Sequence, residues 1–104
     1  MGKTAGIRQG DLLPALVAQA TTETGVVDLT QFVGGITFRM VCGSTVVTGP
    51  ATGDASGNLT YNWNSGDTNV AGTYSAVFIG TDGTGKTETF PTGSNLTVIV
   101  VPRI

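Results

Sequence analysis

Residues 58–78, NLTYNWNSGDTNVAGTYSAVF, contain the only tryptophan and both tyrosines of the 104-residue chain. The stretch predicts two strands joined by a polar loop that contains glycine. Side chains alternate between the two faces of a strand, so each strand can turn an apolar row inward. These rows are Leu59, Tyr61 and Trp63 in the first strand and Tyr74, Ala76 and Phe78 in the second. We expect them to form the centre of a β-sandwich core.

Further strands are predicted on both sides of this stretch, at residues 3–9, 15–21, 36–42, 45–52, 86–90 and 95–101. Phe38 and Met40 belong to an inward row of the 36–42 strand. A short helix competes with the strand at 15–21, since Ala and Leu favour helices. Gly49-Pro50 interrupts the 45–52 strand and indicates a bulge or an edge position. Val98 lies in the last strand, whose two faces are both apolar, so we expect cover on both sides, with a neighbouring subunit on one of them.

Turns are predicted where Gly, Pro and Asp punctuate these strands. The turn-forming residues are Gly10, Asp11, Pro14, Asp67, Gly72, Asp82 and Gly83. Pro14 removes a backbone donor and indicates an edge or a kink. Asp82-Gly83 predicts a hairpin between the strand that ends near residue 80 and the strand at 86–90.

The predicted fold is therefore a single all-β domain over residues 1–104, with about seven to eight short, mainly antiparallel strands. Turn signals recur at about the ten-residue spacing of β-sandwiches. The expected core residues are Phe38, Met40, Leu59, Tyr61, Trp63, Tyr74, Phe78 and Val98.

Charge and residue usage argue against several functions. The net charge is −2 and the five basic residues are scattered, which argues against a nucleic-acid partner. No apolar run approaches the roughly 18 residues of a membrane span. The chain has no histidine, its carboxylates lie mostly in turns, and no metal-ligand spacing is present. We therefore expect neither an enzyme nor a cofactor nor a bound metal. Cys42 has no cysteine partner and is expected to be buried.

The aromatic residues leave one alternative open. Trp63, Tyr61 and Tyr74 could stack on sugars if they lay on a surface, which would make the chain a carbohydrate-binding adhesion module. Their alternation with polar residues favours a core row instead.

Several segments in order resemble a known family. They are IRQGD at 7–11 with Pro14, VDLT at 27–30 ahead of ITFRM at 36–40, GNLTYNW at 57–63, DT at 67–68, GTY at 72–74, Phe78, DG at 82–83, and TFP at 89–91 with the closing strand. This ordered set resembles the immunoglobulin-like domain at the N-terminus of phage baseplate upper proteins and related minor tail proteins of siphophages. The resemblance covers nearly the whole chain, although no single motif is specific.

The resemblance implies an immunoglobulin-like β-sandwich that serves as a structural module of a virion. Such a module is made in the host bacterial cytoplasm, docks onto other tail or baseplate proteins and is present in multiple copies. In the family this domain leads into further coiled-coil or receptor-binding regions, whereas this chain ends at Ile104. That difference leaves a capsid decoration protein as an alternative, and contact with a glycan of the host surface as a lesser one.

Overall fold

The computed structural model describes residues 4–22, 25–26, 28–90 and 96–103. The fold is all-β, and these residues contain no α-helix. The strands are β1 (Thr4–Arg8), β2 (Leu16–Gln19), β3 (Thr21–Thr22), β4 (Gly25–Val26), β5 (Gly35–Cys42), β6 (Thr45–Gly53), β7 (Asn58–Tyr61), β8 (Gly72–Thr81), β9 (Thr87–Phe90) and β10 (Leu96–Val101). The 3-10 helix η1 (Leu29–Gln31) precedes β5.

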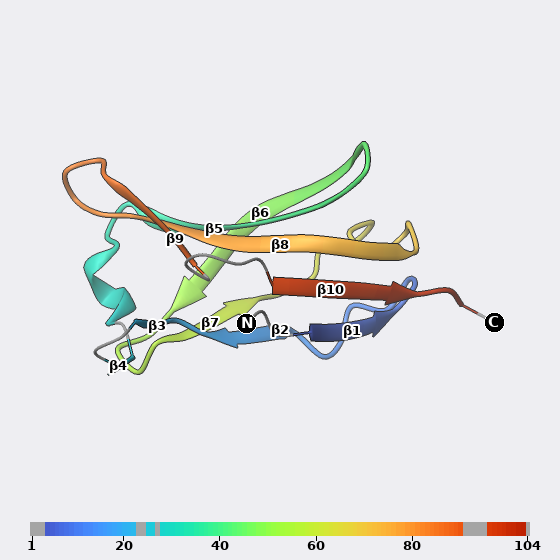
Figure 1. The fold of residues 1–104 in the computed structure, drawn as a ribbon, viewed down its shortest axis with the longest axis horizontal. Helices are drawn as coiled ribbons and strands as arrows, with labels where there is room; N and C mark the ends of the chain where they lie inside the picture. Colours follow the sequence, from blue (N-terminus) through green and yellow to red (C-terminus); the bar gives the residue numbers. More distant parts are fainter. Residues whose placement is uncertain (1–3, 23–24, 27, 91–95, 104) are drawn as a thin grey trace.

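Eight strands form one mixed sheet in the order β1-β10-β8-β5-β6-β7-β2, with β9 also paired to β8. The β1–β10 pair is parallel and the other pairs are antiparallel. Figure 1 shows the sheet curling, so that β1 and β2, which stand at opposite ends of the strand order, lie in the same lower layer. The curl encloses the apolar rows between the layers.

Strand β6 belongs to both layers. Its residues 45–51 pair with β5, and Thr52 and Gly53 then pair with β7. Gly49 allows Tyr61 to approach β6 closely, because a Cβ at this position would lie 2.8 Å from the hydroxyl oxygen of Tyr61. The expected interruption at Gly49-Pro50 is wrong: both residues stay in the β5 ladder. The alternative expectation, an edge position, is correct. At an edge, Pro50 can occupy a place in β6 where the strand ladder needs no N–H donor.

The two strands of residues 58–78 do not pair with each other. β7 lies between β6 and β2, whereas β8 lies between β5 and its partners β10 and β9. The strand predicted up to residue 63 ends at Tyr61, and Trp63 lies in the following loop. The hairpin predicted at Asp82-Gly83 is formed by β8 and β9.

Residues 15–21 form no helix. The chain makes β2, and then pairs β3 with β4 in a separate two-stranded sheet. The expected first residues of two strands, Lys3 and Asn95, lie outside the described residues. On β10 the row of Leu96, Val98 and Val100 is buried, whereas Ile99 and Val101 on the other face are 36% and 38% exposed. The cover expected on both faces is therefore not supplied by the described part of this chain.

Candidate functional site

The eight residues expected in the core are all buried. Their exposed fractions range from 0% for Phe38, Met40, Tyr61, Phe78 and Val98 to 7% for Trp63. The ring of Phe38 stacks on Tyr61 with centroids 4.3 Å apart. The ring of Trp63 meets both of these rings edge-on, at 5.9 and 5.4 Å. Cys42 is only half-buried, at the edge of this core, because it lies next to the turn that ends β5.

The aromatic side chains that could have formed a sugar-binding surface are buried. Tyr61 and Tyr74 are 0% and 1% exposed and Trp63 is 7% exposed, so none of the three presents a ring face to solvent. Each polar atom of these rings is used inside the fold. The indole Nε1 of Trp63 donates to the carbonyl oxygen of Pro14 at 3.1 Å, and the hydroxyl of Tyr74 donates to that of Val70 at 2.6 Å. The three rings do not form the surface platform that a carbohydrate-binding module needs.

Tyr61 links the core to a carboxylate in the loop after β7. Its hydroxyl donates to the Oδ2 atom of Asp67, which also accepts the backbone N–H of Asn64 at 2.8 Å. Burial, followed by the hydrogen bond and the negative charge of Asp67, raises the pKa of Tyr61 to about 12. The arrangement keeps the phenol protonated and holds the loop after β7 against the core.

A polar clasp joins three segments that are distant in sequence, and it contains two of the expected turn residues, Gly10 and Asp11. The guanidinium of Arg103 bonds the Oδ1 atom of Asp11 at 2.6 Å and the carbonyl oxygen of Gln9 at 2.9 Å. Gly10 donates its N–H to the carbonyl oxygen of Thr68, and the Thr68 hydroxyl donates to that of Asp11. The clasp fixes the segment that leads from β1 towards β2.

The other expected turn residues also act locally. Asp82 accepts the N–H and hydroxyl of Thr84 and the N–H of Lys86, which lowers the pKa of the Asp82 carboxyl. Gly83 lies in the same turn, and Gly72 begins β8 with a φ of +154°. Asp54 closes the turn between β6 and β7 in the same way, by accepting the N–H groups of Ser56 and Asn58. These carboxylates organise turns.

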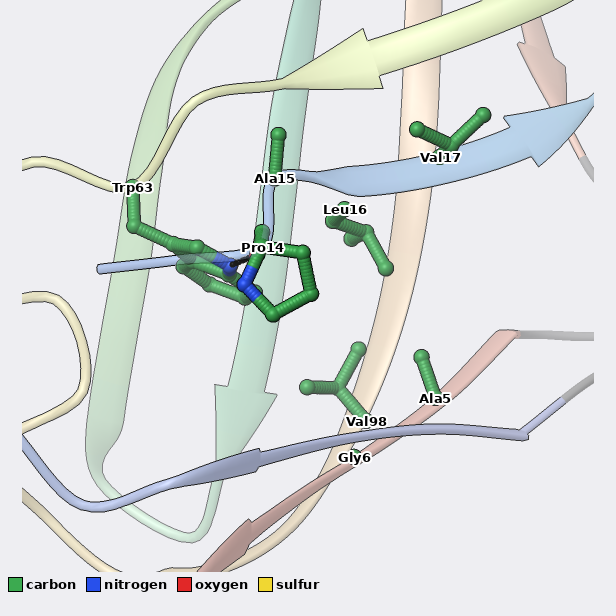
Figure 2. Close-up of a pocket in the computed structure, with 8 residues that line it drawn as sticks. All are labelled: Ala5, Gly6, Pro14, Ala15, Leu16, Val17, Trp63 and Val98. Carbon is green, nitrogen blue, oxygen red and sulfur yellow. Dashed lines mark hydrogen bonds between the residues drawn. The ribbon is translucent and has the colours of Figure 1, made fainter. Parts of the chain in front are cut away.

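An apolar pocket of about 240 Å³ opens between the ends of the sheet, where β1 faces β2. Figure 2 shows its lining, with β1 and β10 on one side and the segment leading into β2 on the other. The lining residues are Ala5, Gly6, Pro14, Ala15, Leu16, Val17, Trp63 and Val98. We call this region the seam. None of its lining residues carries a charge.

Exposed apolar side chains border the seam. Val17 is 62% exposed and lines the pocket, and Leu13, which precedes Pro14, is 79% exposed. Among the described residues, β1 and β2 each have a strand partner on one side only. The outer sides of both strands therefore offer backbone N–H and C=O groups next to an apolar pocket. Sequence reasoning missed this site, because the seam is defined by which strand ends the sheet and not by a motif.

Neither a metal site nor a membrane-spanning helix is seen in the described residues. No group of three or more Asp, Glu or Cys side chains in them could hold a metal ion. No helix in the same ranges is long and apolar enough to cross a membrane.

Comparison of the chain with protein-family models, with curated proteins and with solved structures finds no match.

Proposed function

We propose that this chain is an immunoglobulin-like β-sandwich and a non-enzymatic structural module of a bacteriophage tail or baseplate, docked in multiple copies onto other virion proteins. The ordered sequence resemblance motivates the virion assignment. The strand order supports the finer fold assignment. In an immunoglobulin domain the strands named C, F and G are adjacent, and B pairs with E. Here β5, β8 and β10 are adjacent in that order, and β2 pairs with β7.

Tyr74 supports the same assignment. Immunoglobulin domains carry a tyrosine near the start of strand F, whose hydroxyl bonds the backbone a few residues upstream. Tyr74 lies at the third position of β8 and donates to the carbonyl oxygen of Val70, four residues earlier. Two features differ from antibody domains: the chain has a single cysteine, and its tryptophan follows β7 instead of lying on β5.

The seam is the proposed docking site. An extended segment of a neighbouring virion protein can add to the outer edge of β2, through backbone hydrogen bonds, and place an apolar side chain in the pocket. Such strand addition combines main-chain bonds for affinity with a side-chain pocket for specificity. The clasp around Asp11 and the bond from Trp63 to Pro14 hold the 9–15 segment in place, so the pocket is formed before the partner binds.

Incorporation of seam variants into phage particles tests this function. Val17→Asp places a charge on the exposed face of β2, next to the pocket, on a side chain exposed enough to tolerate it, and we expect the folded protein to be lost from purified particles. Val33→Asp is the matched control: Val33 is 76% exposed, lies between η1 and β5, and is not part of the pocket lining. Equal incorporation of the two folded variants would exclude the seam as the docking site.

The same surface would serve a capsid decoration protein. Gold labelling of particles by electron microscopy separates the two locations: label on the tail or baseplate supports the proposal, and label on the head supports the alternative.

A further inference from the structure

The outer edge of β6 is a further unpaired strand edge, and it lies in the other layer, away from the seam. Residues 45–51 pair with β5 on one side, and only Thr52 and Gly53 pair with β7 on the other. Among the described residues, no backbone or side-chain hydrogen bond outside the β5 ladder involves residues 45–51. Figure 1 shows the β5–β6 hairpin extending to a free loop, away from β10 and β1.

The hairpin geometry determines which backbone groups lie at this edge. Gly43-Ser44 is a two-residue loop that joins the paired residues Cys42 and Thr45, so Thr45 exchanges hydrogen bonds with Cys42. Antiparallel pairs alternate between bonded and non-bonded positions. Thr45, Val47, Gly49 and Ala51 therefore turn their N–H and C=O groups towards β5. The intervening residues, Val46, Thr48 and Pro50, turn theirs outward. Pro50 fits this assignment, because its missing N–H belongs on the open side.

The open part of this edge lacks the features that keep strand edges apart. Edge strands are usually protected by charges, by proline or by a bulge. β6 has no charged residue, and its only proline lies past Thr48, so that Val46 and Thr48 together leave two N–H and two C=O groups free to pair. The side chains from Thr45 to Thr48 are all β-branched, and Val46 is 48% exposed.

We propose that two copies of this chain pair through β6, antiparallel and about a two-fold axis at Val47. In this register Val46 of each copy exchanges hydrogen bonds with Thr48 of the other, and the two Val47 residues face each other at the non-bonded position. Four hydrogen bonds then satisfy the two N–H and two C=O groups of Val46 and Thr48 in each copy. Because the contact uses the same patch on both copies, it closes as a dimer.

A register centred on Thr48 is less favourable. It places Ser44 of one copy opposite Thr52 of the other, where the edge is already occupied by β7. The register centred on Val47 keeps both turns clear of β7 and leaves each Pro50 just beyond the last bonded pair. The short contact belongs to the small interface class, below about 1,200 Å², so we expect weak association of the isolated protein. The inference does not depend on the virion assignment, since it concerns purified protein.

Cysteine cross-linking tests the register, in a Cys42→Ser background and under mild oxidation. Val47→Cys should give a covalent dimer, since opposed residues lie within disulfide range. Val46→Cys alone should not, because its two copies would lie about 8 Å apart from strand rise and spacing, beyond the reach of a disulfide. A mixture of Val46→Cys and Thr48→Cys should cross-link again. This second test uses two exposed positions, so it holds even if Val47→Cys disturbs the half-buried Val47 site.

The same experiment can contradict the proposal. Val70→Cys, on an exposed valine outside β6, measures cross-linking by random collision. If Val47→Cys and the mixture cross-link no faster than Val70→Cys, copies do not pair through β6. If Val46→Cys alone dimerises as well as Val47→Cys, the register is wrong. Val46→Lys added to Val47→Cys should reduce the cross-link at least several-fold, because it puts a charge on the pairing edge.

Discussion

Trp63 shows how a single side chain can join parts of the fold that are distant in sequence. Its ring packs edge-on against Phe38 and Tyr61, and its Nε1 donates to the carbonyl oxygen of Pro14, 49 residues earlier in the chain. It also lines the pocket at the seam. The residue therefore supports both the core and the segment that forms one wall of the candidate docking site.

Replacement of Trp63 by alanine is expected to lower the free energy of unfolding by about 3–5 kcal/mol, because it removes a large buried ring and leaves a cavity. Chemical denaturation measures this directly. Trp63→Phe is the matched variant: it keeps an aromatic ring but loses the hydrogen bond to Pro14, and should cost less than the alanine change. A loss under about 1 kcal/mol for Trp63→Ala would contradict the burial of the ring.

Because the pKa of Tyr61 is raised by folding, we expect the folded protein to lose stability at alkaline pH. The pKa of the Tyr61 phenol in the folded protein is about 12, above the ordinary value of 10, so the folded state holds the proton more tightly than the unfolded state. The stabilisation is fully present below pH 10 and is lost as the pH rises from 10 to 12. The urea midpoint should fall over this range.

In Tyr61→Phe the urea midpoint should fall less between pH 10 and 12, since the titrating group is gone. Burial also raises the pKa of Tyr74, so part of the fall should remain in that variant. An identical pH dependence in the wild type and in Tyr61→Phe would contradict the assignment of the pH effect to Tyr61.

At the scale of the strands, the alternation of apolar and polar residues correctly predicts which side chains are buried. It does not predict which strands are neighbours in the sheet. The apolar row of β7 and the row of β8 were both foreseen, and both are buried. Their separation into different partners was not foreseen, because strand pairing depends on contacts between distant segments. Gly49 and Gly53 illustrate the same limit. Gly49 was expected to interrupt its strand and Gly53 lies beyond the expected end of that strand, yet both remain in β6 and make room for Tyr61 and Leu29.

Gly80 allows the close approach of Phe32 to β8. A Cβ at this position would lie 2.7 Å from the Phe32 ring, which is itself buried and packs edge-on against Phe90. Gly80→Ala should therefore destabilise the protein by about 1–3 kcal/mol, the usual range for overpacking a core. Thermal or urea unfolding measures the change.

Gly6→Ala is the control, since a Cβ there has its nearest neighbour at 3.9 Å and the residue also lies in a strand. It should leave stability nearly unchanged or raise it slightly. Equal losses for the two alanine variants would show that glycine itself, and not the contact with Phe32, determines the effect.

At the scale of the molecule, the described part of the curled sheet has open strand edges in two places with different surroundings, the seam and β6. The seam combines a strand edge with an apolar pocket, whereas β6 offers a strand edge with no pocket and no charge. The first suits a different protein that supplies an apolar side chain, and the second suits a second copy. A module with both edges can dock to a partner and still contact its neighbours, which is what the proposed multi-copy role requires.

The sequence could predict the all-β class, the buried rows and most of the turns from local patterns. It could not predict the seam or the open edge of β6, because each depends on where the strand order ends or changes layer. Leu13 and Val17 show this directly. Each is an ordinary apolar residue in the sequence, and only the position of β2 at the end of the sheet places these exposed side chains near an open strand edge.

The central claim is that this chain is a component of a phage particle, and quantitative mass spectrometry of gradient-purified particles tests it most directly. Particles should come from cells in which the gene is expressed together with the rest of its phage. We predict that the protein co-purifies with infectious particles at a constant multiple-copy ratio to the other structural proteins, and that the ratio persists after a high-salt wash. Infectious particles that never contain the protein would contradict the claim.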